Sequence, residues 1–170
     1  MDKKQLAILV DNDDKVVGYR EKIEAHTWPT PLHRAISVVI FNGDKILLQK
    51  RSATKPVWPL YWSNTCCGNV LRGETYRDCA KRRLKEEMGV TTSIKESFVF
   101  KYKKKYDESY GEHEIDHVFV GKYSGKVKLD PEDAVDYNWM TKEKLLKDLK
   151  TNPKKYTPWF KIISEELFNF

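Results

Sequence analysis

The chain lacks the features of an exported, disulfide-stabilised or membrane-embedded protein. It has three cysteines in 170 residues, an odd number, and two of them are adjacent. A bond between Cys66 and Cys67 would be badly strained, and the C-x-x-C pairs of a zinc ribbon are missing. No apolar run reaches the roughly 18 residues of a membrane-spanning helix. We therefore expect one domain over residues 1–170, reduced and located in the cytoplasm.

Charge is abundant and unevenly divided between the two signs. There are 31 Lys and Arg residues against 25 Asp and Glu, which gives a net charge of +6. This excess favours an anionic partner, which could be a nucleic acid, a phosphorylated small molecule or an anionic membrane surface. The stretch KYKKKY at 101–106 would suit RNA, but it equally fits a solvated strand or loop. Composition alone leaves these classes of partner open.

Hydrophobic patterning predicts an α+β fold with a mixed, curved β-sheet. Apolar, β-branched runs predict strands at QLAILV (5–10), ISVVIF (36–41), SFVFKY (97–102), DHVFVGKY (116–123), KVKL (126–129) and AVDYNWM (134–140). Asn42-Gly43 marks a hairpin turn between two strands. Helices are expected over 75–88, in TKEKLLKDLK after Thr141, and over 157–168, where Thr157 would cap the helix and Pro158 would take its first position.

The helix expected over 75–88 carries charges in its apolar stripe. At 100° per residue, one face gathers Tyr76, Cys79, Ala80, Leu84 and Met88. Arg83 and Glu87 fall within this stripe, and burying an unpaired charge costs several kcal/mol. Either the two residues pair with each other at a spacing of four, or the stripe borders a cleft. In the second case Arg83 contacts a phosphate and Glu87 a divalent metal.

The residues around this helix decide between the two interpretations. Gly68 is followed after five residues by Glu74, and after seven more by RRLKEEMGV. This spacing resembles the Nudix box, which implies the Nudix fold, an α/β/α sandwich, and a loop-helix-loop that holds a metal against a diphosphate. The box of Nudix hydrolases has Glu where this chain has Arg83. A cation there removes negative charge from the place where metals gather, so we expect diphosphate binding rather than hydrolysis.

Four further segments extend the resemblance over nearly the whole chain. They are AHTWPTPLHRA (25–35), WSNTCCG (62–68), GEHEIDHVF (111–119) and YTPW (156–159). Together with the altered box, they resemble type 1 isopentenyl-diphosphate isomerases. The resemblance implies conversion of isopentenyl to dimethylallyl diphosphate through a tertiary carbocation. It also implies a small prenyl diphosphate as partner, no nucleic acid or membrane partner, and a monomer or weak homodimer.

The same resemblance implies roles for individual residues. Cys67 would be a thiol acid/base and Glu114 its partner across the substrate, assisted by Tyr102, while Trp159 would offer its π face to the carbocation. The diphosphate would be held by Lys22, Arg51, Lys55 and Arg83. Without the resemblance, these residues would be unremarkable core, strand and surface positions. Strand alternation places Cys66 on the face opposite Cys67, where it would serve packing.

Two divalent ions are also implied. Glu87 would hold Mg²⁺ at the diphosphate, and a second ion, Mn²⁺, Zn²⁺ or Mg²⁺, would bind His26, His33, Glu112 and Glu114. The family has a third histidine shortly after the catalytic cysteine, but this chain has Asn69. An amide oxygen is a weaker ligand for zinc than imidazole and suits harder ions. We expect an altered metal site that neither His113 nor His117 joins. The alternatives are a Nudix-type hydrolase or a non-catalytic prenyl-diphosphate-binding relative.

Overall fold

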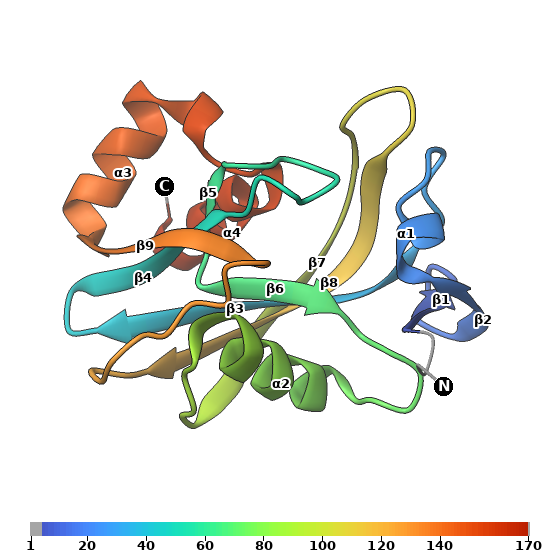
Figure 1. The fold of residues 1–170 in the computed structure, drawn as a ribbon, viewed down its shortest axis with the longest axis horizontal. Coiled ribbons are helices and arrows are strands. Elements are labelled where there is room, and N and C mark those ends of the chain that lie inside the picture. The colour runs from blue at the N-terminus through green and yellow to red at the C-terminus, as the bar shows by residue number, and fades with distance from the viewer. Residues whose placement is uncertain (1–4, 170) are drawn as a thin grey trace.

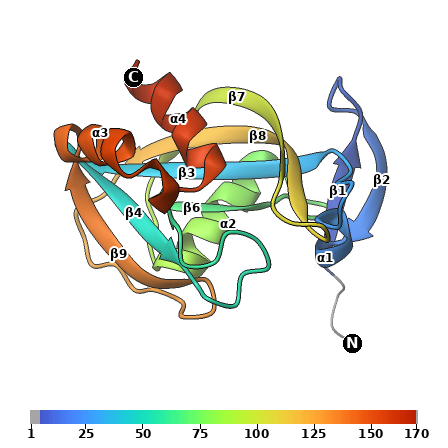
Figure 2. The same ribbon diagram turned by 90° about the horizontal axis from the view of Figure 1, so that it is seen from above.

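A computed structural model describes residues 5–169 as one mixed β-sheet with helices on both faces (Figures 1 and 2). In chain order the elements are β1 (Leu6–Val10), β2 (Val16–Glu21), α1 (Lys22–Ala25), β3 (His33–Asn42), β4 (Lys45–Arg51), β5 (Trp62–Ser63), β6 (Cys66–Asn69), α2 (Tyr76–Met88), β7 (Ile94–Lys105), β8 (Gly111–Lys122), β9 (Ala134–Thr141), α3 (Lys142–Thr151) and α4 (Pro158–Phe168), with a 3₁₀ turn at Pro153–Lys155. Among the described residues no helix combines the length and apolar character needed to cross a membrane.

The central strand β3 is buried on both faces. It runs parallel to β8 over residues 33–41 and antiparallel to β6 over residues 35–38. Ile36, Val38 and Ile40 pack in the core that also contains α2, whereas Val39 packs in the core beneath α3 and α4. Because successive side chains point to opposite faces, a strand between two layers needs apolar residues in sequence. The expected α/β/α sandwich is therefore confirmed.

Helix α2 begins and ends where the sequence predicts. The Thr75 hydroxyl accepts a hydrogen bond from the amide of Asp78, the Asp78 carboxylate accepts one from the amide of Thr75, and Gly89 ends the helix at φ 64°. This capping box satisfies amides that have no partner within the helix. The apolar stripe expected from Cys79 to Met88 is buried against the sheet, and Arg83 and Glu87 lie at its cleft-facing edge.

Three local expectations were wrong. Residues 126–129 form no strand, because the amides of Lys128 and Asp130 bond to carbonyls at the end of α2 instead of to a neighbouring strand. Thr157 makes no side-chain cap, because its hydroxyl bonds to the Ser63 hydroxyl at 2.9 Å. The hairpin exists, but Asn42 pairs with Lys45 and the turn consists of Gly43 and Asp44. Pro158 does take the first position of α4.

Candidate active site

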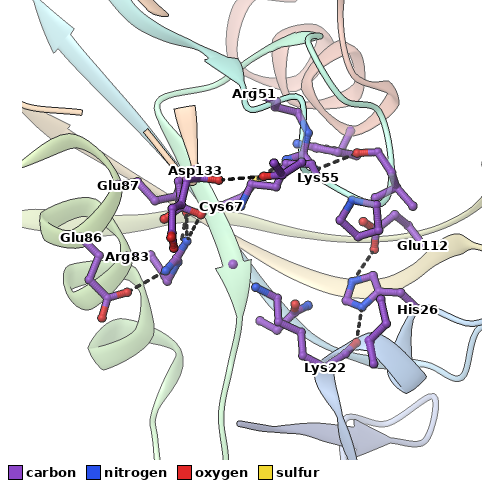
Figure 3. A pocket seen from close by; sticks show the side chains of 18 of the residues that line it. Lys22, His26, Arg51, Lys55, Cys67, Arg83, Glu86, Glu87, Glu112 and Asp133 are labelled. Carbon is purple, nitrogen blue, oxygen red and sulfur yellow. Dashed lines mark hydrogen bonds and ion pairs between the residues drawn. The ribbon is translucent and has the colours of Figure 1, made fainter. Parts of the chain in front are cut away.

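One cleft of about 940 Å³ collects the residues expected to act in catalysis and binding (Figure 3). Its walls come from α1, the end of β4, β6, α2, β7, β8, α4 and the loops that follow β4 and precede β9. The expected residues that line it are Lys22, His26, Arg51, Lys55, Cys67, Arg83, Glu87, Tyr102, Glu112, Glu114 and Trp159. His33 is the exception, since it is fully buried behind the cleft wall. Residues from distant parts of the sequence thus share one cavity.

Two strands that both pair with β3 place the thiol and the carboxylate that face this cleft. Cys67 lies in β6 and reaches the cleft, whereas its neighbour Cys66 packs in the core under α2, as strand alternation predicts. Glu114 lies in β8 directly opposite Tyr102 in β7, so that both side chains share a face of the sheet. The Tyr102 hydroxyl donates a hydrogen bond of 2.8 Å to Oε2 of Glu114.

The protonation states of the two groups differ. Burial raises the pKa of Cys67 to about 12, against the opposing effect of the Arg51 guanidinium, whose Nη1 lies 4.0 Å from Sγ. Burial alone would also raise the pKa of Glu114, but the facing His33 imidazole, whose Nε2 lies 3.4 Å from Oε1, lowers it to about 2. In the same surroundings burial and Glu114 raise the pKa of Tyr102. At neutral pH the thiol therefore holds its proton and the carboxylate is ionised.

Aromatic rings close the apolar end of the cleft. Trp159, at the start of α4, is 3% exposed and contacts Trp58 edge to face, with 5.6 Å between ring centroids. The guanidinium of Arg51 lies 5.1 Å from the centroid of the Trp159 ring, and the Tyr102 ring lies 6.4 Å from it. The face of Trp159 therefore already accepts one positive group.

Four cations converge on the polar part of the cleft. Arg51 donates hydrogen bonds to the carbonyls of Val57 and Trp58. Arg83 donates from Nη2 to Oε1 of Glu87 at 2.7 Å. Lys22 and Lys55 complete the group; withdrawal from solvent in the cleft and the charges of Arg83 and Lys55 lower the pKa of Lys22. Such a gathering of like charges favours a multivalent anion.

A second group of side chains forms a buried cluster at the other end of the cleft. Its members are His26, His33, Glu112 and Glu114, and one potential ligand atom from each lies within 4.8 Å of the others. Nδ1 of His26 and Nδ1 of His33 each lie within 2.9 Å of a backbone carbonyl. With Nδ1 donating to that carbonyl, Nε2 is in each ring the nitrogen that can bind a metal ion on loss of any proton it carries, as in many histidine-ligated sites.

The polar atoms of this cluster are not all satisfied by one another. Nε2 of His33 and Oε2 of Glu112 are buried and make no hydrogen bond within residues 5–169, although facing groups approach to 3.4 and 3.2 Å. Burial alone would lower the pKa of His26, but Glu112 raises it to about 9, while burial and Glu114 raise the pKa of Glu112. Both shifts show that the site attracts positive charge. Nitrogen and carboxylate donors at these separations fit a divalent metal ion.

Three further side chains near this cluster, those of His113, His117 and Asn69, could be considered as metal ligands. Nδ1 of His113 lies 3.0 Å from the Thr30 carbonyl, and Nδ1 of His117 lies 2.9 Å from the Glu96 carboxylate, so both rings have partners outside the cluster. Asn69 is buried in the cleft wall, and its Nδ2 donates a hydrogen bond of 3.4 Å to Oε1 of Glu114. Its amide is therefore within reach of the cluster.

Three neighbours of the expected site residues were not predicted from the sequence. Gln49 donates from Nε2 to Oε2 of Glu87 at 2.7 Å and so fixes that carboxylate. Asp116 lines the cleft beside Glu114 and accepts a hydrogen bond of 2.7 Å from Ser37. Asp133 pairs with Lys55 and Arg83. Only Asp116 had a signal in the sequence, since it continues the alternation of Glu112 and Glu114 along β8.

Comparison with known proteins agrees with this arrangement. The NUDIX domain family matches residues 31–160. The isopentenyl-diphosphate Delta-isomerase 2 of Aromatoleum aromaticum is 41% identical over 153 residues, which cover 89% of this chain and 80% of that protein. The isopentenyl-diphosphate Delta-isomerase of Serratia proteamaculans is 37% identical over 164 residues, covering 96% and 91%.

Solved structures support the same fold. The crystal structure of DR0079 from Deinococcus radiodurans has a TM-score of 0.72 at 21% identity, and the match covers 87% of this chain and 90% of that one. A MutT NUDIX hydrolase from Burkholderia pseudomallei has a TM-score of 0.64 at 21% identity, covering 79% and 96%. The chain therefore belongs to the NUDIX family and, within it, to the isopentenyl-diphosphate Delta-isomerases.

Proposed function

We propose that this protein, acting as one domain over residues 1–170, isomerises isopentenyl diphosphate to dimethylallyl diphosphate. The observation that carries the proposal is the placement of Cys67 on β6 and Glu114 on β8, with both side chains facing one cleft. Moving a double bond by one position requires a proton to be added at one carbon and another to be removed two carbons away. Two acid–base groups on separate elements suit this requirement.

The proposed reaction adds one proton to the substrate and removes one, so no net proton is consumed. One proton is added to the terminal methylene, which leaves a tertiary carbocation at the branched carbon. Loss of a proton from the methylene on the other side of that carbon forms the new double bond. In the free protein Cys67 is protonated and Glu114 is ionised, so the pair offers one donor and one acceptor. Tyr102 holds the Glu114 carboxylate through its hydroxyl.

The carbocation and the diphosphate require opposite surroundings, and the cleft offers both. At the apolar end the Trp159 ring supplies cation–π stabilisation, worth about 2 kcal/mol or more where water is excluded. The diphosphate oxygens accept charge-assisted hydrogen bonds from Lys22, Lys55 and Arg83 at the polar end and from Arg51, which lies beside the Trp159 ring. A substrate held by its diphosphate would extend its short prenyl chain past Cys67 and Glu114 toward Trp159. A small prenyl diphosphate is accordingly the proposed substrate of a monomer or weak homodimer.

Two divalent ions belong to this proposal. Glu87, fixed by Gln49, would take part in binding Mg²⁺ beside the diphosphate. His26, His33, Glu112 and Glu114 would hold a second ion, for which Mn²⁺, Zn²⁺ and Mg²⁺ are the candidates. When bound, these ions would neutralise charge on the diphosphate and on the buried carboxylates. Asn69 next to Glu114 makes the softer zinc the weakest of the three candidates.

Hydrolysis of a diphosphate is the second candidate, because the fold is that of Nudix hydrolases. The Arg83 guanidinium argues against it. It donates to Glu87 with Nε and Nη2 and to Glu86 with Nη1, and so adds positive charge among the carboxylates that would gather catalytic metal. A relative that binds prenyl diphosphates without turnover is the third candidate, and the facing Cys67 and Glu114 argue against it.

Exchange of protons with heavy water tests the proposal directly. With Mg²⁺ or Mn²⁺ present, the protein should incorporate deuterium into isopentenyl diphosphate and release no phosphate. Cys67→Ala and Glu114→Gln should each slow this exchange by at least about 100-fold, with little change in unfolding temperature. Cys66→Ala, which alters the thiol on the opposite face, should keep most of the exchange. Phosphate release without deuterium exchange would favour a hydrolase. Metal-dependent binding of the prenyl diphosphate with neither deuterium exchange nor phosphate release would favour the non-catalytic relative.

A further inference from the structure

Two of the cleft cations share a carboxylate from the loop before β9. Oδ1 of Asp133 accepts a hydrogen bond of 2.9 Å from Nη2 of Arg83 and also pairs with Nζ of Lys55 (Figure 3). The side chains of Asp133, Lys55 and Arg83 are 14%, 18% and 13% exposed. All three line the cleft. Within the cavity, the single charge of Asp133 therefore offsets part of the charge of the two cations, and Glu86 and Glu87 also pair with Arg83.

Backbone hydrogen bonds fix the position of this carboxylate. The Ser52 amide donates to the Asp133 carbonyl at 3.0 Å, and the Asp133 amide donates to the Asp130 carbonyl at 3.0 Å. The first bond ties the loop before β9 to the loop that carries Lys55. Because both loops are held to each other, the ion pair is part of the architecture of the cleft and not a chance surface contact.

Asp133 is charged, and within residues 5–169 it pairs with only two of the four cleft cations, Lys55 and Arg83. Burial alone would raise the pKa of Asp133, but Lys55 and Arg83 lower it, so the carboxylate is ionised at neutral pH. Among the described residues Lys22 forms no ion pair, and Arg51 donates to two backbone carbonyls. Lys55 and Arg83 therefore have a carboxylate partner in Asp133, which Lys22 and Arg51 do not share.

We propose that Asp133 is the resident counter-ion of the anion site: it holds Lys55 and Arg83 toward the cleft in the free protein and competes with phosphate oxygens for both. The inference rests on the proposed function, which assigns the two cations to the diphosphate. A phosphate that bonds Lys55 and Arg83 must displace Asp133 from them or lie beside it, and two anions at such a distance repel. Asp133 thus positions the cations and also limits how tightly any phosphate binds.

Titration with inorganic anions tests this role without requiring turnover. Asp133→Asn keeps the shape of the side chain and removes its charge. Without Mg²⁺, we expect calorimetry to show about tenfold tighter binding of inorganic pyrophosphate, and also tighter binding of inorganic phosphate. The matched control is Asp136→Asn, which makes the same substitution at an exposed position of β9 that does not line the cleft and should change either affinity by less than about twofold.

The proposal fails if Asp133→Asn binds pyrophosphate no tighter than the control variant, or binds it more weakly. Kinetics gives a second readout that a merely structural role would not produce: Asp133→Asn should lower KM and also lower kcat, because the cations lose their orientation. A raised KM would contradict it. If Asp133→Asn does not fold, Asp133→Ser is titrated instead. If the unaltered protein incorporates no deuterium into isopentenyl diphosphate, the isomerase proposal is refuted. The pyrophosphate titration would still test the role of Asp133, because it measures binding without turnover.

Discussion

At the scale of single residues, the surroundings of Cys67 favour the neutral thiol. Burial raises its pKa to about 12 despite the nearby Arg51 guanidinium. Because only the thiolate is nucleophilic, about one molecule in ten thousand should be reactive at pH 8. We expect the rate of alkylation by iodoacetamide to rise about tenfold per pH unit from 7 to 10 without levelling off. Mass spectrometry of the peptide containing Cys67 measures this rate.

The other two cysteines provide the control for that measurement. Cys66 and Cys79 are fully buried, so neither should be alkylated in the folded protein. In urea all three thiols should react with the profile of an ordinary cysteine, levelling off above its pKa of about 8.5. A plateau below pH 9 for Cys67 in the folded protein would mean that the thiolate is stabilised in the cleft, contrary to its assignment as the protonated partner.

The residues that the sequence could predict are those whose position follows from a local pattern. Strand alternation separates Cys67 from Cys66, and the box spacing places Arg83 beside the cleft. Gln49 and Asp133 lie 38 and 50 residues from their partners in α2. In the sequence they look like an ordinary strand glutamine and an ordinary turn aspartate. Only the packing of two loops and a strand around α2 gives them a role.

At the scale of elements, the close contact between β6 and α2 depends on Gly68. A Cβ atom added there would lie 2.7 Å from Cγ of Arg83, so the arginine would have to move. We expect Gly68→Ala to lower the free energy of unfolding by about 1–3 kcal/mol, as other overpacked sites do. It should also weaken binding of inorganic pyrophosphate, because the Arg83 guanidinium loses its alignment with Glu87. Urea unfolding and calorimetry measure the two effects.

Gly18→Ala is the matched control for this contact. A Cβ atom at Gly18 would lie 3.9 Å from Cδ1 of Leu9, an ordinary van der Waals distance. Its stability should change by less than about 0.5 kcal/mol, and its pyrophosphate affinity should not change. If Gly68→Ala behaves like this control, close packing of Arg83 against β6 is not what orients the guanidinium.

Elements defined by local sequence were easier to predict than the partners of strands. Helix α2 carries its capping box and terminal glycine within its own sequence, and both act as expected. The apolar runs at β3 and β8 predict strands but not that these two pair in parallel over residues 33–41. Residues 126–129 have the composition of a strand, yet their backbone bonds to the end of α2. Competition between such distant partners is decided by tertiary packing, which a single sequence does not encode locally.

At the scale of the whole molecule, the His/Glu cluster adds a link between the N-terminal part of the chain and the main sheet, beside the packing of Ile8 and Val10 in the core that contains α2. Strand β1 pairs with β3 at one position, Leu9 with His33. Ala7, Leu9 and Ala25 form a small core separate from the two large ones. His26 follows α1 in this N-terminal part, whereas Glu112 belongs to β8 in the main sheet. A metal ion bound to both would therefore tie the N-terminal part to the sheet.

Metal binding should accordingly raise the unfolding temperature of the whole chain. A ligand that binds the folded state at 100 times its Kd stabilises it by about 2.7 kcal/mol, which corresponds to roughly 5–10 °C for a chain of this length. We expect this shift on adding Mn²⁺ to chelator-treated protein, and its loss in His26→Gln. His113→Gln, on the same strand as Glu112 but engaged away from the cluster, should keep the shift. Asn69→His should enlarge the rise in unfolding temperature produced by Zn²⁺, because imidazole is the better zinc ligand. If Mn²⁺ raises the unfolding temperature of His26→Gln as much as that of the unaltered protein, the metal binds elsewhere.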